Sequence, residues 1–317
     1  MTDDKQTELD EKIIELIEQN GRISYRDIAK ELGISERQAG YRFRRLLEDD
    51  VIRVITVVDA YAVGFKVILA IGVKVADRAA MAVAAELAEI PNVIASAVMA
   101  GEYDVEILVA VPSHRALAEL VREQLSEING IRSLHPSLFL DVVKYETGSG
   151  SVLSQPLRLS IPESSDVADA DKAIINRLWD NPLETNENIA NTLGMSETTV
   201  RNRVNRLRKS GIIHITAIRN VALGPEMVFA SIGIELAAGH HEQVIEQLSG
   251  LRQVHFLANV LGRYDVMAQV LVKDTAELSA FLSDVLAPMP GIRSARAEQS
   301  LQVLKYDYRW RIVGPGN

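Results

Sequence analysis

The chain of 317 residues contains two copies of one sequence pattern. They are displaced by 161 positions, as from Gly101 to Gly262. The motif Gly101-Glu102-Tyr103-Asp104 matches Gly262-Arg263-Tyr264-Asp265, and Gly130-Ile131-Arg132-Ser133 matches Gly291-Ile292-Arg293-Ser294. This period is far longer than the roughly 20–50 residues of solenoid repeats. We interpret the chain as a duplicated domain pair, an arrangement that can turn a symmetric dimer into one pseudo-symmetric chain.

Composition narrows the class of protein. Hydrophobic residues make up 47% of the chain, so each half can bury a core, and there is no cysteine, which excludes disulfides and thiolate metal sites. The net charge of −9 argues against indiscriminate polyanion binding but leaves room for a local basic element. The N-terminus is polar and acidic, and apolar runs such as Val67–Val73 are too short to span a bilayer. We therefore expect a cytoplasmic protein that makes no membrane contact.

Each half begins with a helical head. Apolar spacing predicts a helix over Asp10–Glu18, and capping residues Ser24 and Ser35 predict two further helices, the first over Tyr25–Leu32. The run Val51–Val58 then has the pattern of a strand or hairpin. The second half repeats this order.

Each head is followed by a tail with the pattern βαββαβ, which is ferredoxin-like. The predicted elements of the first tail are Lys66–Val75, Arg78–Ile90, Val93–Ala100, Asp104–Val111, a helix from Ser113 to Glu127, and Ile131–Tyr145. Those of the second are Val228–Leu236, His241–Leu248, Val254–Leu261, Asp265–Val272, a helix opened by Asp274, and Ile292–Tyr306. The fold class is therefore α+β, as a tandem duplication of a three-helix helix-turn-helix head plus a ferredoxin-like domain.

The domain boundaries follow from the same reading. We place the first head at 1–60, the first tail at 61–146, the second head at 170–221 and the second tail at 222–317. The stretch 147–169 is rich in Ser, Gly and Pro and is assigned as a linker.

The heads carry a helix-turn-helix pattern. Small residues Ala29 and Ala190 stand where two helices would cross, and Gly33 and Gly194 supply the turn. The following helix turns polar side chains outward, among them Arg, which binds phosphate or guanine, and Asn and Gln, which read adenine. The candidate DNA-binding residues are Arg37, Gln38, Tyr41, Arg42, Arg45, Thr198, Thr199, Arg201, Asn202, Asn205 and Arg206. The alternative is a solvated basic face on a purely structural three-helix unit.

The two predicted recognition helices differ at their ends. The second ends in Arg208-Lys209, which suits the helix dipole, whereas the first ends in Glu48-Asp49-Asp50, which opposes the dipole and repels phosphate. The first also carries Gly40, at a cost of roughly 1 kcal/mol against Ala. We expect the second head to bind DNA more strongly than the first.

The motifs together identify a resemblance. Ile28-Ala29 followed by Leu32-Gly33-Ile34-Ser35, its copy Ile189-Ala190 followed by Leu193-Gly194-Met195-Ser196, and the hairpin motif in each tail resemble the Lrp/AsnC (leucine-responsive, feast/famine) transcriptional regulators. The resemblance covers both halves and excludes mainly the linker. It implies winged helix-turn-helix heads, double-stranded DNA as partner, and RAM/AsnC-type ligand-binding tails. Those tails pair, so the chains are expected to form dimers or tetramers.

The resemblance also implies an amino acid or similar small effector near the hairpins. The positions that carry over are Gly101, Tyr103, Asp104, Gly262, Tyr264 and Asp265. The alternative is a tight hairpin in which Gly, Tyr and Asp have only structural roles. In the family the last strand brings small hydroxyl residues toward the ligand. Here that stretch reads Leu134-His135-Pro136-Ser137 and Ala295-Arg296-Ala297-Glu298, so we expect the two sites to differ.

Two other functions compete with DNA-binding regulation. Sirohaem decarboxylases resemble this family in fold, so an enzyme is one alternative, and an effector-sensing assembly protein without DNA binding is another. The histidines lack metal-ligand spacing, and no nucleophile elbow or phosphate-binding loop is present. We therefore expect no enzymatic activity, no catalytic residue, no metal and no cofactor.

Overall fold

The computed structural model describes residues 2–60, 62–145, 167–219 and 227–306. Residues 147–166 of the predicted linker lie outside this set. The described helices include none that is both long and apolar enough to cross a membrane.

Each head consists of three helices and a wing strand. The elements are α1 Thr2–Gln19, α2 Tyr25–Leu32, α3 Glu36–Glu48, β1 Ile52–Val58, α6 Asp169–Asp180, α7 Asn186–Leu193, α8 Glu197–Lys209 and β6 Ile213–Arg219. The predicted caps are present: Ser24 Oγ accepts the Asp27 amide at 3.1 Å, and Ser35 Oγ accepts the Gln38 amide at 3.2 Å. Helix α1 begins eight residues before the predicted start, because an acidic, polar segment continues the helix beyond its apolar stripe.

The two heads are joined by their wings. Strands β1 and β6 pair antiparallel, from Ile52 opposite Arg219 to Val58 opposite Ile213. Two buried threonines extend the contact, because Thr56 Oγ1 donates to the Leu178 carbonyl and Thr216 Oγ1 donates to the Glu18 carbonyl, each at 2.6 Å. Each wing therefore bonds to the first helix of the other head.

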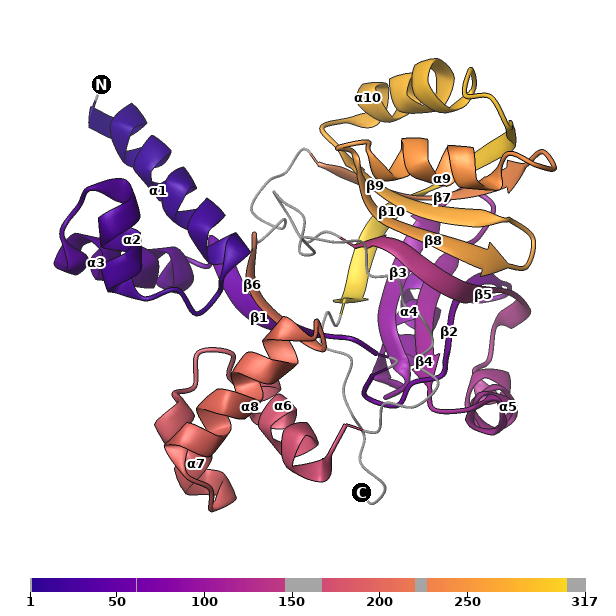
Figure 1. Ribbon diagram of the computed structural model, residues 1–317. Helices are drawn as coiled ribbons and strands as arrows, with labels where there is room; N and C mark the ends of the chain where they lie inside the picture. Colours follow the sequence, from indigo (N-terminus) through magenta and orange to yellow (C-terminus); the bar gives the residue numbers. More distant parts are fainter. Residues whose placement is uncertain (1, 61, 146–166, 220–226, 307–317) are drawn as a thin grey trace.

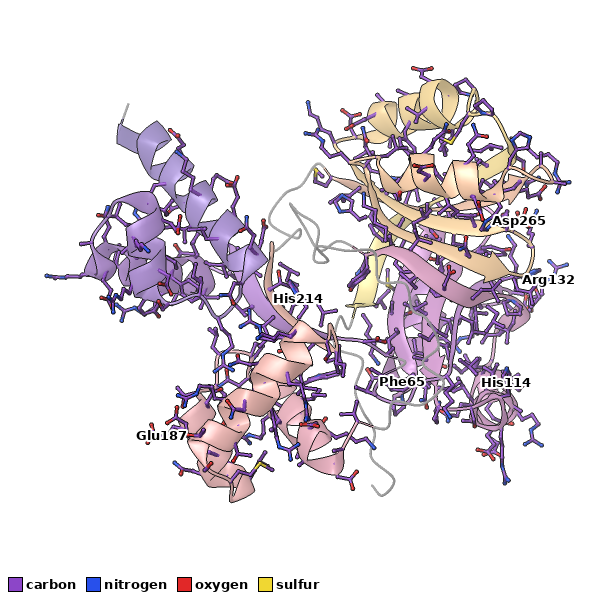
Figure 2. The ribbon with its side chains drawn as sticks, viewed as in Figure 1. Phe65, His114, Arg132, Glu187, His214 and Asp265 are labelled. Atoms are coloured by element: carbon purple, nitrogen blue, oxygen red, sulfur yellow. The ribbon has the colours of Figure 1, made fainter. Side chains whose placement is uncertain are left out.

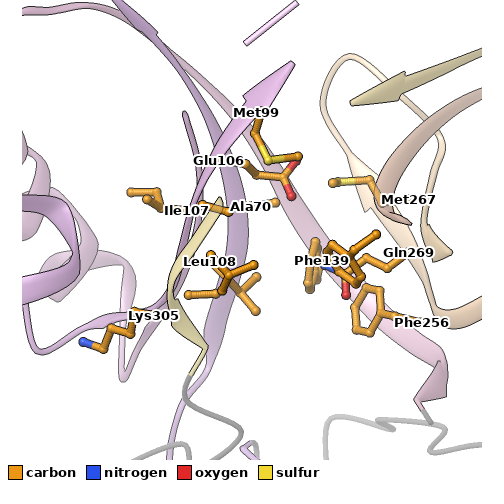
Figure 3. A pocket seen from close by; sticks show the side chains of 14 residues that line it. Ala70, Met99, Glu106, Ile107, Leu108, Phe139, Phe256, Met267, Gln269 and Lys305 are labelled. Carbon is orange, nitrogen blue, oxygen red and sulfur yellow. The ribbon is translucent and has the colours of Figure 1, made fainter. Parts of the chain in front are cut away.

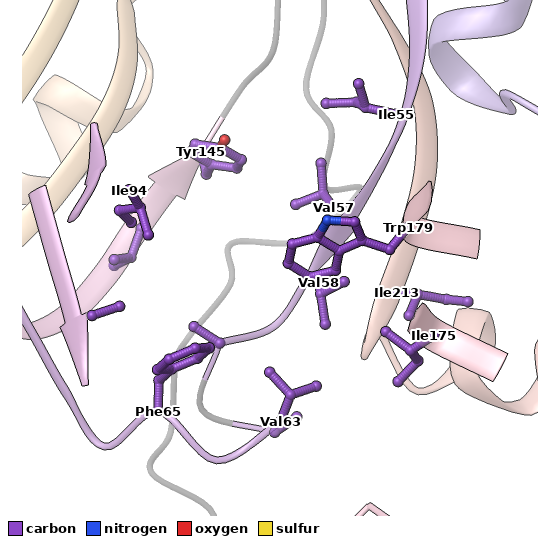
Figure 4. Packing of buried hydrophobic residues seen from close by; sticks show 14 of the residues in the cluster. Ile55, Val57, Val58, Val63, Phe65, Ile94, Tyr145, Ile175, Trp179 and Ile213 are labelled. Carbon is purple, nitrogen blue, oxygen red and sulfur yellow. The ribbon is translucent and has the colours of Figure 1, made fainter. Parts of the chain in front are cut away.

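Apolar packing reinforces this exchange. Val57 and Val58 of the first wing lie in the same buried cluster as Ile175 and Trp179 of α6 (Figure 4). Burying such a side chain fully stabilises a protein by roughly 1.5–3 kcal/mol. Part of the first head's wing is thus core for the second head, and the heads form one packed unit (Figure 1).

The tails have the predicted βαββαβ order. The elements of the first are β2 Val67–Val75, α4 Ala80–Glu89, β3 Val93–Ala100, β4 Val105–Val111, α5 His114–Glu123 with the short turn η1 Leu125–Glu127, and β5 Ile131–Tyr145. Those of the second are β7 Val228–Leu236, α9 His241–Ser249, β8 Val254–Leu261, β9 Val266–Val272, α10 Thr275–Ala280 with the π-helical turn η3 Phe281–Leu286, and β10 Ile292–Tyr306.

The two tails close into one barrel of eight strands in the order β10-β3-β4-β2-β5-β8-β9-β7. The long strands β5 and β10 cross between the tails: Leu138 of β5 pairs with Leu261 of β8, and Gln299 of β10 pairs with Ala100 of β3. These two pairings are equivalent under the 161-residue displacement. The tails of one chain are therefore a pseudo-symmetric dimer, with helices outside the barrel (Figure 1).

Candidate nucleic-acid interface and effector site

Helix α8 presents a polar outer face. Its inner residues Val200, Val204 and Leu207 are buried, and Ser196 caps its first turn by accepting the Thr199 amide at 3.1 Å. The exposed predicted residues are Thr198, Thr199, Arg201, Asn202, Asn205 and Arg206. These hydroxyl, amide and guanidinium groups can hydrogen-bond to phosphates and base edges.

A buried carboxylate fixes α8 to the first helix of its head. Asp171 of α6 is 3% exposed and pairs with Arg203 at 2.9 Å and Arg206 at 2.5 Å. Arg206 keeps 62% of its side chain exposed, so this predicted DNA-binding residue can contact both Asp171 and a phosphate. The sequence pattern gave no sign of its second, structural role.

The recognition helix of the first head carries less outward positive charge. Arg37, Gln38, Tyr41 and Arg45 are exposed on α3, as predicted, but Arg45 pairs with Asp49 at 3.2 Å. The structure departs from the prediction at Arg42, whose side chain is only 15% exposed and pairs with Asp10 of α1 at 2.7 Å. Arg42 is the counterpart of Arg203, so both halves use this position to hold the recognition helix in place.

The hairpin motif of each tail makes contacts that stabilise the fold. Asp104 Oδ2 accepts the Val75 amide at 2.8 Å, and Asp265 Oδ2 accepts the Leu236 amide at 2.7 Å, at the ends of β2 and β7. Figure 2 shows Asp265 at its turn. The two motif tyrosines are buried over glycines of the neighbouring strands. Tyr103 covers Gly72 and Tyr264 covers Gly233. These contacts match the tight-hairpin alternative, and the effector role of the six motif residues stays a prediction.

A side chain of the second tail reaches the first hairpin. The Glu298 carboxylate of β10 is 5% exposed and accepts the Tyr103 amide at 3.1 Å. Burial raises the pKa of Glu298, while hydrogen bonds from the Tyr103 and Glu102 backbone oppose that rise. A Cβ atom on Gly101 would overlap this carboxylate. Glycine at 101 therefore makes room for an internal carboxyl group.

The two hairpins also contact each other. The Arg263 guanidinium donates to the Glu102 carboxylate, and Arg296 lies 3.6 Å from the other oxygen of Glu102. The hydrogen bond to Arg263 lowers the pKa of Glu102, and the same bond raises the pKa of Arg263. Close by, the Tyr264 hydroxyl is buried with no hydrogen-bond partner among the described residues, and burial raises its pKa to about 12.

A small cavity lies inside the barrel between the two tails. Its volume is about 30 Å³, which is enough to hold water, and most of its lining is apolar, including Phe139, Phe256 and Met267 (Figure 3). Glu106 is the acidic residue in this lining, and burial raises its pKa to about 7. Glu106 is not among the predicted site residues, although it is the lone carboxylate within the apolar run Val105–Val111.

Family models match both halves of the chain. The model described as the Lrp/AsnC ligand binding domain matches residues 68–149 and 229–310, which is more than half of the chain. The model described as a winged helix-turn-helix DNA-binding domain matches residues 6–53 and 168–214. The chain therefore belongs to the Lrp/AsnC family of transcriptional regulators, with both family domains present twice. The resemblance inferred from the motifs and the duplicated α+β fold are confirmed.

Curated relatives correspond in length to one half of this chain. An uncharacterized HTH-type transcriptional regulator of Pyrococcus horikoshii is 31% identical over 153 residues, which are 47% of this chain and 97% of the relative. The HTH-type transcriptional regulator Ptr1 of Methanocaldococcus jannaschii is 31% identical over 137 residues, 43% of this chain and 92% of the relative.

A solved structure matches the duplicated arrangement as a whole. The crystal structure of the siroheme decarboxylase NirDL aligns with a TM-score of 0.66 over 94% of this chain and 92% of that chain, at 18% sequence identity. At this identity the likeness shows a shared fold.

Proposed function

We propose that the protein is a sequence-specific DNA-binding transcriptional regulator whose second head makes the stronger DNA contacts. The main support for this proposal is the polar outer face of α8. There, Arg201 keeps 52% of its side chain exposed, 3.7 Å from Glu197, beside exposed Thr198, Asn202 and Asn205. The joined wings support it further, because β1–β6 pairing fixes the two recognition helices relative to each other.

Binding is tested on DNA recovered with the native protein by genomic immunoprecipitation. Fluorescence anisotropy then compares Arg201→Ala, Arg37→Ala and the control Arg122→Ala, which removes an exposed arginine from α5 of the tail. We expect the greatest loss from Arg201→Ala, about 1–3 kcal/mol if a base contact is lost. Each lost phosphate contact lowers the log–log salt slope by roughly 0.9. Equal losses from the two heads would contradict the asymmetry, and losses no larger than the control would contradict DNA recognition.

The proposal includes a small effector, an amino acid or related metabolite, that acts at the tails. Support comes from the family's ligand-binding domain, present twice, and from the buried polar groups where the hairpins meet. An effector must bind one assembly or head arrangement more tightly than another. A thermal-shift screen of amino acids and 2-oxo acids tests this, and a screen without a stabilising compound would contradict it.

We also propose that chains self-associate as dimers or tetramers. Leu140 on β5 and Leu301 on β10 occupy equivalent positions and are 48% and 62% exposed, as expected for apolar residues that another copy covers. Light scattering of the wild type and of Leu140→Lys/Leu301→Lys tests this. A wild-type monomer at micromolar concentration would refute it.

Absence of enzymatic activity remains part of the proposal. The shared fold with a siroheme decarboxylase makes tetrapyrrole binding the test to run. We expect no change in the tetrapyrrole absorption spectrum on adding the protein, and a saturable Soret shift would favour the enzyme instead.

A further inference from the structure

The first hairpin holds a carboxyl group that belongs to the chain itself. The Glu298 carboxylate lies against the Gly101 backbone, accepts the Tyr103 amide at 3.1 Å and is 5% exposed. Backbone amides at a glycine turn are the groups that bind a free carboxylate. The Glu298 side chain therefore occupies the position in which the carboxylate of a ligand would accept hydrogen bonds from those amides.

The second hairpin has a different neighbour. Ser137 of β5 is the counterpart of Glu298, and its Oγ would lie 3.2 Å from a Cβ on Gly262. Ser137 is buried, but its side chain ends in a short neutral hydroxyl. The three atoms nearest to that Cβ position are the Pro136 carbonyl oxygen, the Ser137 Cα and the Ser137 Oγ. The second hairpin therefore lacks the internal carboxylate of the first.

We infer that the two hairpins are equivalent carboxylate sites of which the first is permanently occupied by Glu298, so that a carboxylated effector binds only at the second, once per chain. The first part rests on the contacts of Glu298 alone. The second part rests on the proposed effector function.

The first part is tested by chemical rescue. The variant Glu298→Ser gives the first hairpin the serine that the second hairpin has at the equivalent position, so we expect it to fold. The shorter side chain leaves space for formate. We expect sodium formate to raise the melting temperature of Glu298→Ser by roughly 2–4 °C more than sodium chloride at equal ionic strength. The wild type and Glu298→Gln, whose side chain still fills the site, should not show this excess.

Amide NMR locates the bound formate. The backbone N–H signals of Tyr103 and Glu102 should shift in a saturable way in Glu298→Ser and stay fixed in the wild type. Glu184→Ser removes a buried carboxylate from the second head and controls for general rescue of a lost acid. Equal effects of formate and chloride on Glu298→Ser, or formate shifts in the wild type at Tyr103, would overturn the internal occupancy.

A mixture of the twenty amino acids tests the second part by thermal shift. Ser137→Glu installs a carboxylate at the second hairpin and should abolish the wild-type response, whereas Glu298→Ser should enlarge it. Equal responses of the wild type and Ser137→Glu would overturn the single-site inference. If no compound of the broader effector screen stabilises the wild type, the proposed effector function fails with this second part, while the formate experiment still decides the first.

Discussion

Glu102 and Arg263 occupy equivalent positions in the two halves of the chain and form an ion pair with each other. In a symmetric dimer, a residue at this position would face its own copy and a charge would be repelled. Duplication allowed the two copies to diverge into opposite charges. The pair is partly exposed, with 29% of the Glu102 side chain and 35% of the Arg263 side chain accessible, so its contribution to stability is small.

Charge reversal at Glu102 should weaken the contact between the tails. Glu102→Arg sets guanidinium groups against each other, and we expect a loss of about 1 kcal/mol in the free energy of unfolding. The double variant Glu102→Arg/Arg263→Glu should regain most of it, as measured by a double-mutant cycle in denaturant. Reversing Arg293 and Glu235, an ion pair within the second tail, serves as control. Additive losses from Glu102 and Arg263 would contradict the pairing.

Loss of Asp171 should destabilise the second head more than loss of Asp10 destabilises the first. Asp171 is 3% exposed and holds two arginines, whereas the Asp10 side chain is 35% exposed and pairs with Arg42. We expect Asp171→Ala to cost about 1–3 kcal/mol, because buried polar partners are left unpaired. Denaturant unfolding measures both, with Asp180→Ala, an exposed change on the same helix, as control.

Glu106 should make the tails less stable as pH rises. Its carboxyl loses its proton near pH 4.5 when unfolded, but its pKa in the folded chain is about 7. Stability from this group is thus complete below pH 4.5 and is lost between pH 4.5 and 7. The loss is about 3 kcal/mol. Glu106→Gln should remove this part of the pH dependence, as should Glu106→Met, which matches Met267 of the second half. Parallel pH profiles of wild type and variants would disprove the assignment.

Alanine at Gly72 or Gly233 should force the hairpin tyrosine out of place. A Cβ at either position would overlap the ring of Tyr103 or Tyr264. Such overpacking costs about 1–3 kcal/mol. In the Tyr103→Ala background, Gly72→Ala should become nearly neutral, because the ring is gone. Thermal melts of the four variants give the comparison, and a cost that persists without the ring would point to the backbone instead.

Local patterns in the sequence were sufficient for much of the fold. The strands Ile131–Tyr145 and Ile292–Tyr306 were predicted with their observed bounds, and Gly130 and Gly291 mark the turns before them. The caps at Ser24 and Ser35 depend on residues three positions away and were equally accessible. The glycines of the two hairpins were also identified from the sequence. The sequence did not show that Gly101 must be glycine because the Glu298 side chain packs against it.

Contacts between distant segments were not predictable in this way. In the sequence, Arg42 cannot be distinguished from its exposed neighbours. Only the packing of α1 against α3 shows that Arg42 forms an ion pair with Asp10. Glu298 contacts the first hairpin because β10 crosses to the first tail. Its partner Tyr103 lies nearly 200 residues away in the sequence. A periodic pattern tells which face of an element is buried, but not which other element supplies the partner.

The closed barrel has a consequence for the cell in which the protein works. Two tails on separate chains would have to meet by diffusion before the barrel could close. Here β5 meets β8 and β10 meets β3 within one polypeptide, and the closed ring offers no edge strand to a foreign subunit. The two halves are always made in equal amounts and always find each other. Gene fusion thus fixes the pairing of the two tails within one chain and allows each half to evolve separately.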